Sequence, residues 1–383
     1  MQSSKTKILY ITLALVFGVV LNGFSQQKII ISPDNPLLKV GKRVQFLEDQ
    51  NNNLSIQDIL KPQNQKKFKL HSKEVYNLPA SKTSVWFKIT VQNNSNKDIY
   101  LSIGDSFGTL YADLYKPNKQ NNYSTSQEYG SMRPAQNNDL NSNFHCALLA
   151  QASDSSTQTF YLKIFGPTPK NHAFQIGTFQ ALDKYLQVND YIVTLFVGVI
   201  LALLFYNLFI YFSARDNIYI VYIFYLTWVL FVATFTSGYA LLYKSWLWNY
   251  FYTWNGTGYL LITLFASIYL DLKKIAPRFY RWIWSCTFLL SGVFAILNLT
   301  NIFSIVQMAT AYQTILMLYY LSLLFIGIRL AIRGNRNAYF YTIAWSFVII
   351  GTILFVLTLN GIIPYNRFTY NIQYLGFSLE ALL

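Results

Sequence analysis

The sequence has few charged residues and few cysteines, and both shortages restrict what kind of protein it is. Only 12% of its 383 residues are charged, about half the share usual in soluble proteins, whereas 53% are hydrophobic. At least part of the chain must therefore be solvated by lipid. The two cysteines, Cys146 and Cys286, lie in a polar half and an apolar half of the chain. They are not expected to pair, which excludes a disulfide framework.

Motifs for catalysis, metal binding and phosphate binding are also missing. The three histidines, His71, His145 and His172, have no metal-ligand spacing, and we expect structural or surface roles for them. There is no Gly-x-Ser-x-Gly motif, no phosphate-cradling loop and no evident pair of carboxylates. We therefore expect no enzyme activity, no catalytic residue, no metal and no cofactor. The net charge of +14 is scattered or placed in loops, so we expect no nucleic-acid partner.

Residues 191–383 consist of apolar segments separated by short polar breaks. Segments of about 20 apolar residues suffice to cross the hydrocarbon core of a bilayer. We expect an all-α bundle of seven transmembrane helices, at residues 191–212, 218–238, 256–272, 282–299, 307–332, 338–359 and from Ile372 onward. The last segment, IQYLGFSLEALL, is too short to cross, so we expect the chain to be cut inside its seventh helix.

The amino terminus has the features of an export signal. Lys5 and Lys7 precede an apolar run at residues 8–21, and the small residues Gly23 and Ser25 follow it. This order predicts a secretory signal peptide at residues 1–25, with an uncleaved anchor as the alternative. Both interpretations place residues 26–190 outside the cytoplasm.

Loop charges predict the same orientation independently. With the amino terminus outside, the cytoplasmic breaks carry eight basic residues and the external breaks carry two, Lys244 and Arg367. Such a bias is the positive-inside pattern. We therefore expect a multi-pass protein of the cytoplasmic (inner) membrane with its amino-terminal domain in the periplasm. The eight are Arg215, Lys273, Lys274, Arg278, Arg281, Arg329, Arg333 and Arg336.

The polar half shows a period of two, which is typical of β-strands. Val85, Phe87, Ile89 and Val91 fall on one face of a strand, and a second strand follows the turn at residues 93–96. Similar alternation recurs at residues 110–115, 160–164 and 174–178. We expect one all-β sandwich that binds a ligand at residues 26–185, outside the cytoplasm, followed by the helical domain at residues 186–383.

Aromatic residues of the β domain are the candidates for ligand binding. Trp86, Tyr111 and Tyr115 lie on predicted strands, where an exposed ring can stack on a sugar. Most aromatic residues on strands belong instead to the core or to ordinary surface, and that interpretation applies to each of these three.

Ionisable residues are scarce within the predicted helices. Transporters and ion pumps keep such groups at membrane depth, but here Glu380 is the single interior candidate, because Asp271 lies at the end of its segment. A retinal photoreceptor needs a lysine in its last helix, and the last lysine is Lys274. Asn207 and Gln373 are typical of hydrogen bonds between helices. This pattern favours a bundle that transmits a signal over a pore.

Several short motifs, in order, carry a resemblance to a known family. The membrane motifs are GVILALLFYNLFIYF at residues 198–212, RDN at 215–217, GYA at 238–240, RGNRNA at 333–338, GIIP at 361–364 and GFSLE at 376–380. Through these motifs the chain resembles the bacterial seven-transmembrane receptors with diverse intracellular signalling modules. Through residues 85–94 and 159–165, its polar half resembles one of that family's two extracellular domain types.

The resemblance implies a receptor. It implies a jelly-roll-like external domain that binds carbohydrates or related small molecules, and a cytoplasmic output module such as a histidine kinase, diguanylate cyclase or transcription-factor-like domain, absent from the residues up to Leu383. It also implies that Tyr206, Asn207, Arg215 and Glu380 transmit the signal, and it leaves a homodimer open. Two alternatives stay open: a transporter or channel component with an external capture domain, and a scaffold that anchors the β domain to the bilayer.

Overall fold

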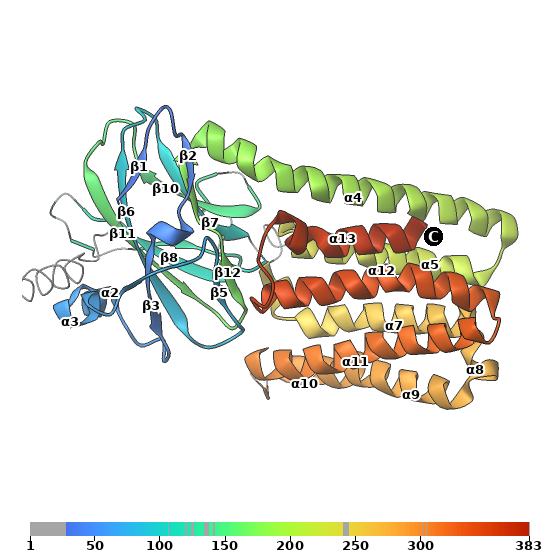
Figure 1. Cartoon of the computed structure of the whole chain (residues 1–383). Coiled ribbons are helices and arrows are strands. Elements are labelled where there is room, and N and C mark those ends of the chain that lie inside the picture. The colour runs from blue at the N-terminus through green and yellow to red at the C-terminus, as the bar shows by residue number, and fades with distance from the viewer. Residues whose placement is uncertain are drawn as a thin grey trace, which may run out of the picture.

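The computed structural model describes residues 28–382, with gaps at 106, 119, 121, 124–125, 134–137, 141, 240–244, 301 and 304. The predicted signal peptide at residues 1–25 lies outside the described residues. A β domain comes first in the chain, and a set of long helices extends from one side of it (Figure 1). The predicted order, an all-β domain followed by an apolar helical region, is therefore confirmed.

The β domain is built from two main sheets and a short two-stranded one. The larger sheet has the order β4-β3-β6-β11-β8-β9, with β1 added parallel to β6, and the smaller has the order β10-β7-β13-β2. Strands β12 and β5 form the third sheet. The strands are β1 (Ile29–Ile31), β2 (Leu37–Lys39), β3 (Gln45–Asp49), β4 (Lys69–Leu70), β5 (Tyr76–Leu78), β6 (Ser84–Asn93), β7 (Ile99–Asp105), β8 (Tyr111–Tyr115), β9 (Ser126–Tyr129), β10 (Phe144–Ala150), β11 (Thr157–Phe165), β12 (Lys170–His172) and β13 (Gln175–Thr178).

The two main sheets share one apolar core. Val85, Phe87 and Ile89 of β6 are fully buried, as the period-two pattern predicts, and they belong to the same cluster as Leu101 and Ile103 of β7 in the other sheet. The opposite face of the larger sheet is covered in part by the short helices α2 (Ile56–Leu60) and α3 (Pro62–Gln65). The jelly-roll connectivity implied by the family resemblance stays a prediction.

Helices lie at each predicted apolar segment, and five described helical segments are long and apolar enough to cross a membrane. These five are α4 (Phe179–Ala214), α5 (Asn217–Thr236), the segment Pro277–Thr300, the part Ala311–Ile332 of α11 (Ile305–Ile332), and α12 (Arg336–Leu359). Pro277–Thr300 contains α9 (Pro277–Phe288), a π-helical segment (Leu289–Val293) and α10 (Phe294–Thr300). The remaining helices are α7 (Phe251–Tyr269), α8 (Leu272–Ile275) and α13 (Arg367–Leu382).

Several helix starts differ from the predicted ones. Helix α4 begins at Phe179, directly after β13, and not at Tyr191. Its first turns are amphipathic: Leu182 and Leu186 are buried against Leu140 and Cys146 of the β domain, while polar residues lie between them. Helix α13 likewise begins at Arg367 instead of Ile372, because its first turns are too polar to register as an apolar run.

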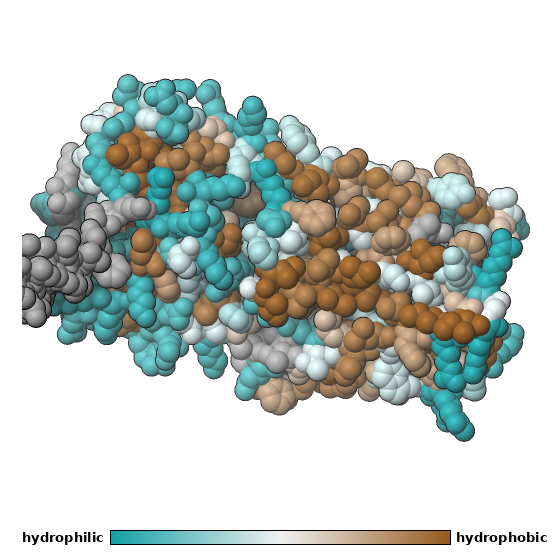
Figure 2. Space-filling view, in the orientation of Figure 1, coloured by the Kyte–Doolittle hydropathy of each residue, from teal (hydrophilic) through white to brown (hydrophobic). Residues whose placement is uncertain are grey.

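The β domain is fixed to the helices by more than the chain connection. Phe107 and Leu110 pack with Phe235 and Trp248 at the ends of the helices. The Asn143 amide donates to the carbonyl of Ser237 at 2.7 Å. Figure 2 shows hydrophobic residues gathered over the helices, with hydrophilic residues over the β domain and at the far end of the helices. The β domain therefore contacts the helix ends directly, through packing and through a hydrogen bond.

Candidate functional site

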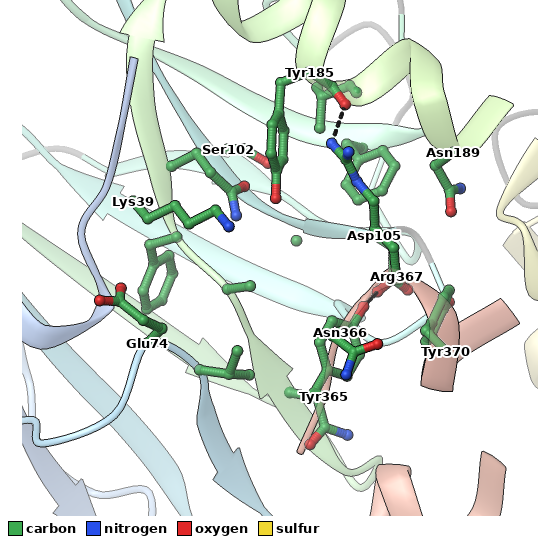
Figure 3. Close-up of a pocket in the computed structure, with 18 of the residues that line it drawn as sticks. Lys39, Glu74, Ser102, Asp105, Tyr185, Asn189, Tyr365, Asn366, Arg367 and Tyr370 are labelled. Atoms are coloured by element: carbon green, nitrogen blue, oxygen red, sulfur yellow. Dashed lines mark hydrogen bonds between the residues drawn. The ribbon is translucent and has the colours of Figure 1, made fainter. Parts of the chain in front are cut away.

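A cavity of about 420 Å³ lies where the β domain meets the helices (Figure 3). Its wall is formed by strands of the smaller sheet, by residues in or beside β5 and β12, by the first turns of α4, and by the segment from the α12–α13 loop into α13. We call it the junction cavity. Its polar lining residues are Lys39, Glu74, Ser102, Asp105, Asn171, Gln175, Tyr185, Asn189, Tyr365, Asn366, Arg367 and Tyr370.

Two cations and one aromatic ring form one end of the junction cavity. The Arg367 guanidinium donates from Nη2 to the Tyr185 carbonyl at 2.6 Å, and its central carbon lies 4.1 Å from the centre of the Tyr185 ring. The Lys39 ammonium lies 6.0 Å from the same ring centre. These three residues come from α13, α4 and β2, so this end of the cavity joins both domains.

A buried carboxyl group lies in the wall on the helix side. Asp105 ends β7, where its Oδ1 accepts from the Gly108 amide at 2.7 Å and its Oδ2 from the Tyr365 hydroxyl at 3.4 Å. Burial raises the pKa of Asp105 above its usual range, while the hydrogen bonds act against that rise. Asp105 thereby connects a strand of the β domain to the loop between α12 and α13.

A smaller, mostly apolar cavity of about 170 Å³ adjoins this wall. It shares Asp105, Asn171, Tyr365 and Tyr370 with the junction cavity and continues between the ends of α7, α11 and α12. Phe107, Pro167, Trp248, Phe251 and Phe355 are among its apolar lining residues. The ends of α7, α11 and α12 next to the junction cavity therefore leave unfilled space between them.

A second polar cavity, of about 430 Å³, lies between the helices and contains three residues predicted to transmit a signal. Tyr206, Asn207 and Glu380 all line it. The Glu380 carboxyl is buried, and the hydroxyls of Tyr222 and Tyr225 donate to its two oxygens at 3.3 and 3.2 Å. We call this the inner cavity. Two hydrogen bonds satisfy a carboxyl group that hydrocarbon alone would not tolerate.

The predicted residues Tyr206, Asn207 and Arg215 all lie in α4 or at its C-terminal cap. Arg215 ends α4 in a left-handed conformation (φ 54°) and so forms the turn into α5. It does not line the inner cavity. The Asn207 amide donates to the Leu203 carbonyl of its own helix at 2.9 Å, and the Tyr206 side chain is 61% exposed on the bundle surface.

The three aromatic candidates of the β domain lie outside the junction cavity. Trp86 is fully buried and stacks on Tyr115 at 5.5 Å, with the Lys163 ammonium 5.3 Å from its ring centre. Tyr111 stacks on Phe165 at 5.0 Å, and the Arg133 guanidinium lies 5.4 Å from its ring centre. Trp86 has no open face for a ligand in this structure, and ligand binding by Tyr111 and Tyr115 stays a prediction.

Sequence reasoning missed the residues of the junction cavity. Lys39, Tyr185 and Arg367 are far apart in the chain, and none lies in a motif. The nearest signal was the placement of Arg367, one of two basic residues in predicted external loops. In the described part of the chain, no cluster of three or more histidine, cysteine, aspartate or glutamate side chains could hold a metal ion.

Comparison with protein families gives two matches in the same order as the two domains. A model described as 7TMR-DISM extracellular 2 matches residues 41–178, and one described as 7TM diverse intracellular signalling matches residues 189–383. The first range falls in the β domain and the second begins within α4. No curated protein matches the chain.

Proposed function

The chain belongs to the 7TMR-DISM family of membrane signalling receptors, and we propose that it senses a small ligand bound in the junction cavity. The observation that carries this proposal is the shared wall of the cavity, since the β domain, α4 and α13 all contribute to it. A ligand there contacts groups from both domains at once. Its binding would change how the β domain rests on the helix ends.

Helix α13 offers a direct route for the signal. Arg367 lies in the junction cavity and Glu380 in the inner cavity, about 20 Å apart along one helix at the usual rise per residue. Helix α4 likewise links Tyr185 to Asn207. A ligand shifts the equilibrium between two arrangements of the β domain on the helices only by its difference in affinity for them. A ligand that contacts both domains can have such a difference, because its contacts change when the two domains move relative to each other.

The finer features of the receptor belong to the same proposal. All seven helical segments cross the inner membrane, the jelly-roll-like β domain lies in the periplasm, and a cytoplasmic signalling domain or partner receives the output. Helix α7 is not among the five candidate spans, but its Gly256 and Gly258 lie in close contact with Ser291 and Trp228 of neighbouring helices, as is common between helices in a membrane. The proposed ligand is a carbohydrate or a related small molecule, and no enzyme activity is proposed.

A labelled protein in liposomes tests the proposal. A fluorophore attached after Ser213→Cys, in a Cys286→Ala background, reports on the α4–α5 turn, while Cys146 is buried and unreactive. The probes are glucose, galactose, glucuronate and galacturonate. We expect at least one to change the fluorescence. Tyr185→Ala should abolish the change, and Lys67→Gln, at an exposed residue away from the cavity, should leave it intact.

The role of the inner cavity has its own readout. Glu380→Leu should leave ligand binding unchanged but remove the fluorescence response, since the substitution lies far from the junction cavity. A ligand that binds without any response at the α4–α5 turn would contradict signalling. Passage of the sugar into the same liposomes would instead support the alternative of a transporter or channel component.

A further inference from the structure

We propose that the ligand of the junction cavity carries a carboxylate, as a sugar acid does, and that Arg367 and Lys39 bind it. This inference rests on the proposed function in one respect, the location of the ligand in this cavity. It adds the chemical class of the ligand and the two residues that select it.

The first argument is the state of the two cations. Among the residues that the structure describes, neither Arg367 nor Lys39 forms an ion pair with a carboxylate. One of the five N–H donors of Arg367 reaches the Tyr185 carbonyl, and the stacked ring holds the guanidinium plane in place. The remaining donors form a positioned fork of the kind that recognises a carboxylate through two parallel bonds.

The second argument concerns the acidic groups of the same wall, which do not neutralise these cations. Glu74 is solvent-exposed and pairs with Lys42 at 3.9 Å. Asp105 accepts hydrogen bonds from Gly108 and Tyr365 on the helix side, and burial favours its neutral form. Figure 3 shows Arg367 and Lys39 near Tyr185, with Glu74 on the side of the cavity away from Arg367.

The third argument is the neutral polar character of the remaining wall. Ser102, Gln175, Asn189 and Asn366 supply hydroxyl and amide groups, which pair with sugar hydroxyls in either direction. Tyr185 and Phe174 supply aromatic surface beside them. A volume of about 420 Å³ lies at the lower end of the range usual for small-molecule sites. A small acid with several hydroxyls uses each of these groups.

Matched pairs of probes test this inference with the purified full-length chain in detergent. Calorimetric titration compares galacturonate with galactose and glucuronate with glucose, with chloride used to hold ionic strength constant. We expect at least one acid to bind at least tenfold more tightly than its neutral partner. Arg367→Gln and Lys39→Gln should each weaken acid binding at least tenfold, whereas Arg367→Lys should weaken it less than Arg367→Gln.

Control variants and a control anion separate the outcomes. Lys67→Gln, an exposed lysine away from the cavity, should leave acid binding unchanged. If Arg367→Gln fails to fold, Lys39→Gln provides the same test, because Lys39 is exposed. Equal binding of acids and neutral sugars, binding of no acid, or full competition by equimolar sulfate would each overturn the inference.

The same titrations distinguish this inference from the proposed function. A neutral sugar that binds as tightly as its acid and changes the fluorescence at the α4–α5 turn would overturn the acid class and support the receptor. An acid that binds through Arg367 and Lys39 without that change would support the inference and contradict the receptor.

Discussion

Two buried histidines make the β domain sensitive to acid. His145 of β10 lies opposite Gly104 in the sheet, and His172 of β12 contacts the Ile103 carbonyl through Nδ1 at 3.0 Å. Burial lowers the pKa of each imidazole to about 4. For His172, the hydrogen bond to Ile103 acts against this shift and the charge of Lys170 adds to it. Both rings are therefore neutral in the folded protein at neutral pH.

Acidification should destabilise the β domain between about pH 6.5 and pH 4. Within this window the unfolded chain binds more protons at these histidines than the folded one, so stability falls as the pH falls. The loss is on the order of 3 kcal/mol per histidine at the acid end. Asp105, whose pKa is raised by burial, acts in the opposite direction, because the folded chain holds its proton more tightly than the unfolded chain does. Thermal unfolding of the full chain, followed by its β-sheet circular dichroism, measures the effect.

Paired substitutions identify the histidines as the cause. His145→Gln combined with His172→Gln should flatten the dependence of the melting temperature on pH, whereas His71→Gln should leave it as in the parent chain. An unchanged slope in the double variant would show that other groups titrate instead.

At the scale of single residues, the sequence predicted the unusual group but not its partners. Glu380 stood out because it is an acid in an apolar run, and the structure buries it. Its partner Tyr225 lies 155 residues earlier in the chain, and no local pattern relates the two. For Trp86 the sequence predicted the strand but not the burial of the side chain. A period of two places a residue on a strand, but it does not identify the segment that covers the ring. Burial of Trp86 depends on α2, which packs beside it.

Among the helices, the contact between α12 and α13 is close because glycines face backbone atoms. A Cβ atom on Gly376 would lie 2.5 Å from the Phe347 carbonyl oxygen, and one on Gly351 would lie 3.1 Å from the Ile372 carbonyl oxygen. Backbone atoms cannot move aside as the tip of a side chain can. Glycine at position 376 therefore permits this close approach, as is common in membrane bundles, whereas a Cβ atom at position 351 would need only a small shift of its neighbour.

Gly376→Ala should separate α13 from α12 and destabilise the helical domain by about 1–3 kcal/mol, the usual cost of overpacking. The matched control is Gly198→Ala in α4, where an added Cβ would meet nothing within 4 Å. Thermal unfolding in detergent should show a lower melting temperature for Gly376→Ala and no loss for Gly198→Ala. Equal melting temperatures for the two variants would contradict the tight contact.

The position of each helix was predictable from apolar length, but some of the starts were not. An apolar run marks where lipid or core surrounds a helix on most sides. Helix α4 extends twelve residues before that run because Leu182 and Leu186 pack on the β domain, and a short amphipathic stretch looks like a linker until its partner surface is known. The first turns of α13 are polar for a related reason: Arg367 and Tyr370 line a cavity.

At the scale of the whole molecule, the distribution of basic residues follows the long axis, which runs from the β domain to the far end of the helices. The α4–α5 turn, α8 and the α11–α12 turn lie at the end of the helices farthest from the β domain (Figure 1). These segments and their neighbours carry the eight basic residues that the sequence assigns to the cytoplasm. The sequence could predict this axis because loop charge and export signal are local features. The junction cavity, built from many segments that are distant in the chain, could not be predicted in that way.

The orientation of this axis in the membrane is testable in intact cells. In a Cys286→Ala background, Lys274→Cys and Arg333→Cys should resist a membrane-impermeant maleimide until the cells are opened, because α8 and the α11–α12 turn would face the cytoplasm. Ile362→Cys, in the exposed loop between α12 and α13 beside the β domain, should react at once. The opposite labelling pattern would place the β domain in the cytoplasm, and a periplasmic ligand could not then reach the junction cavity.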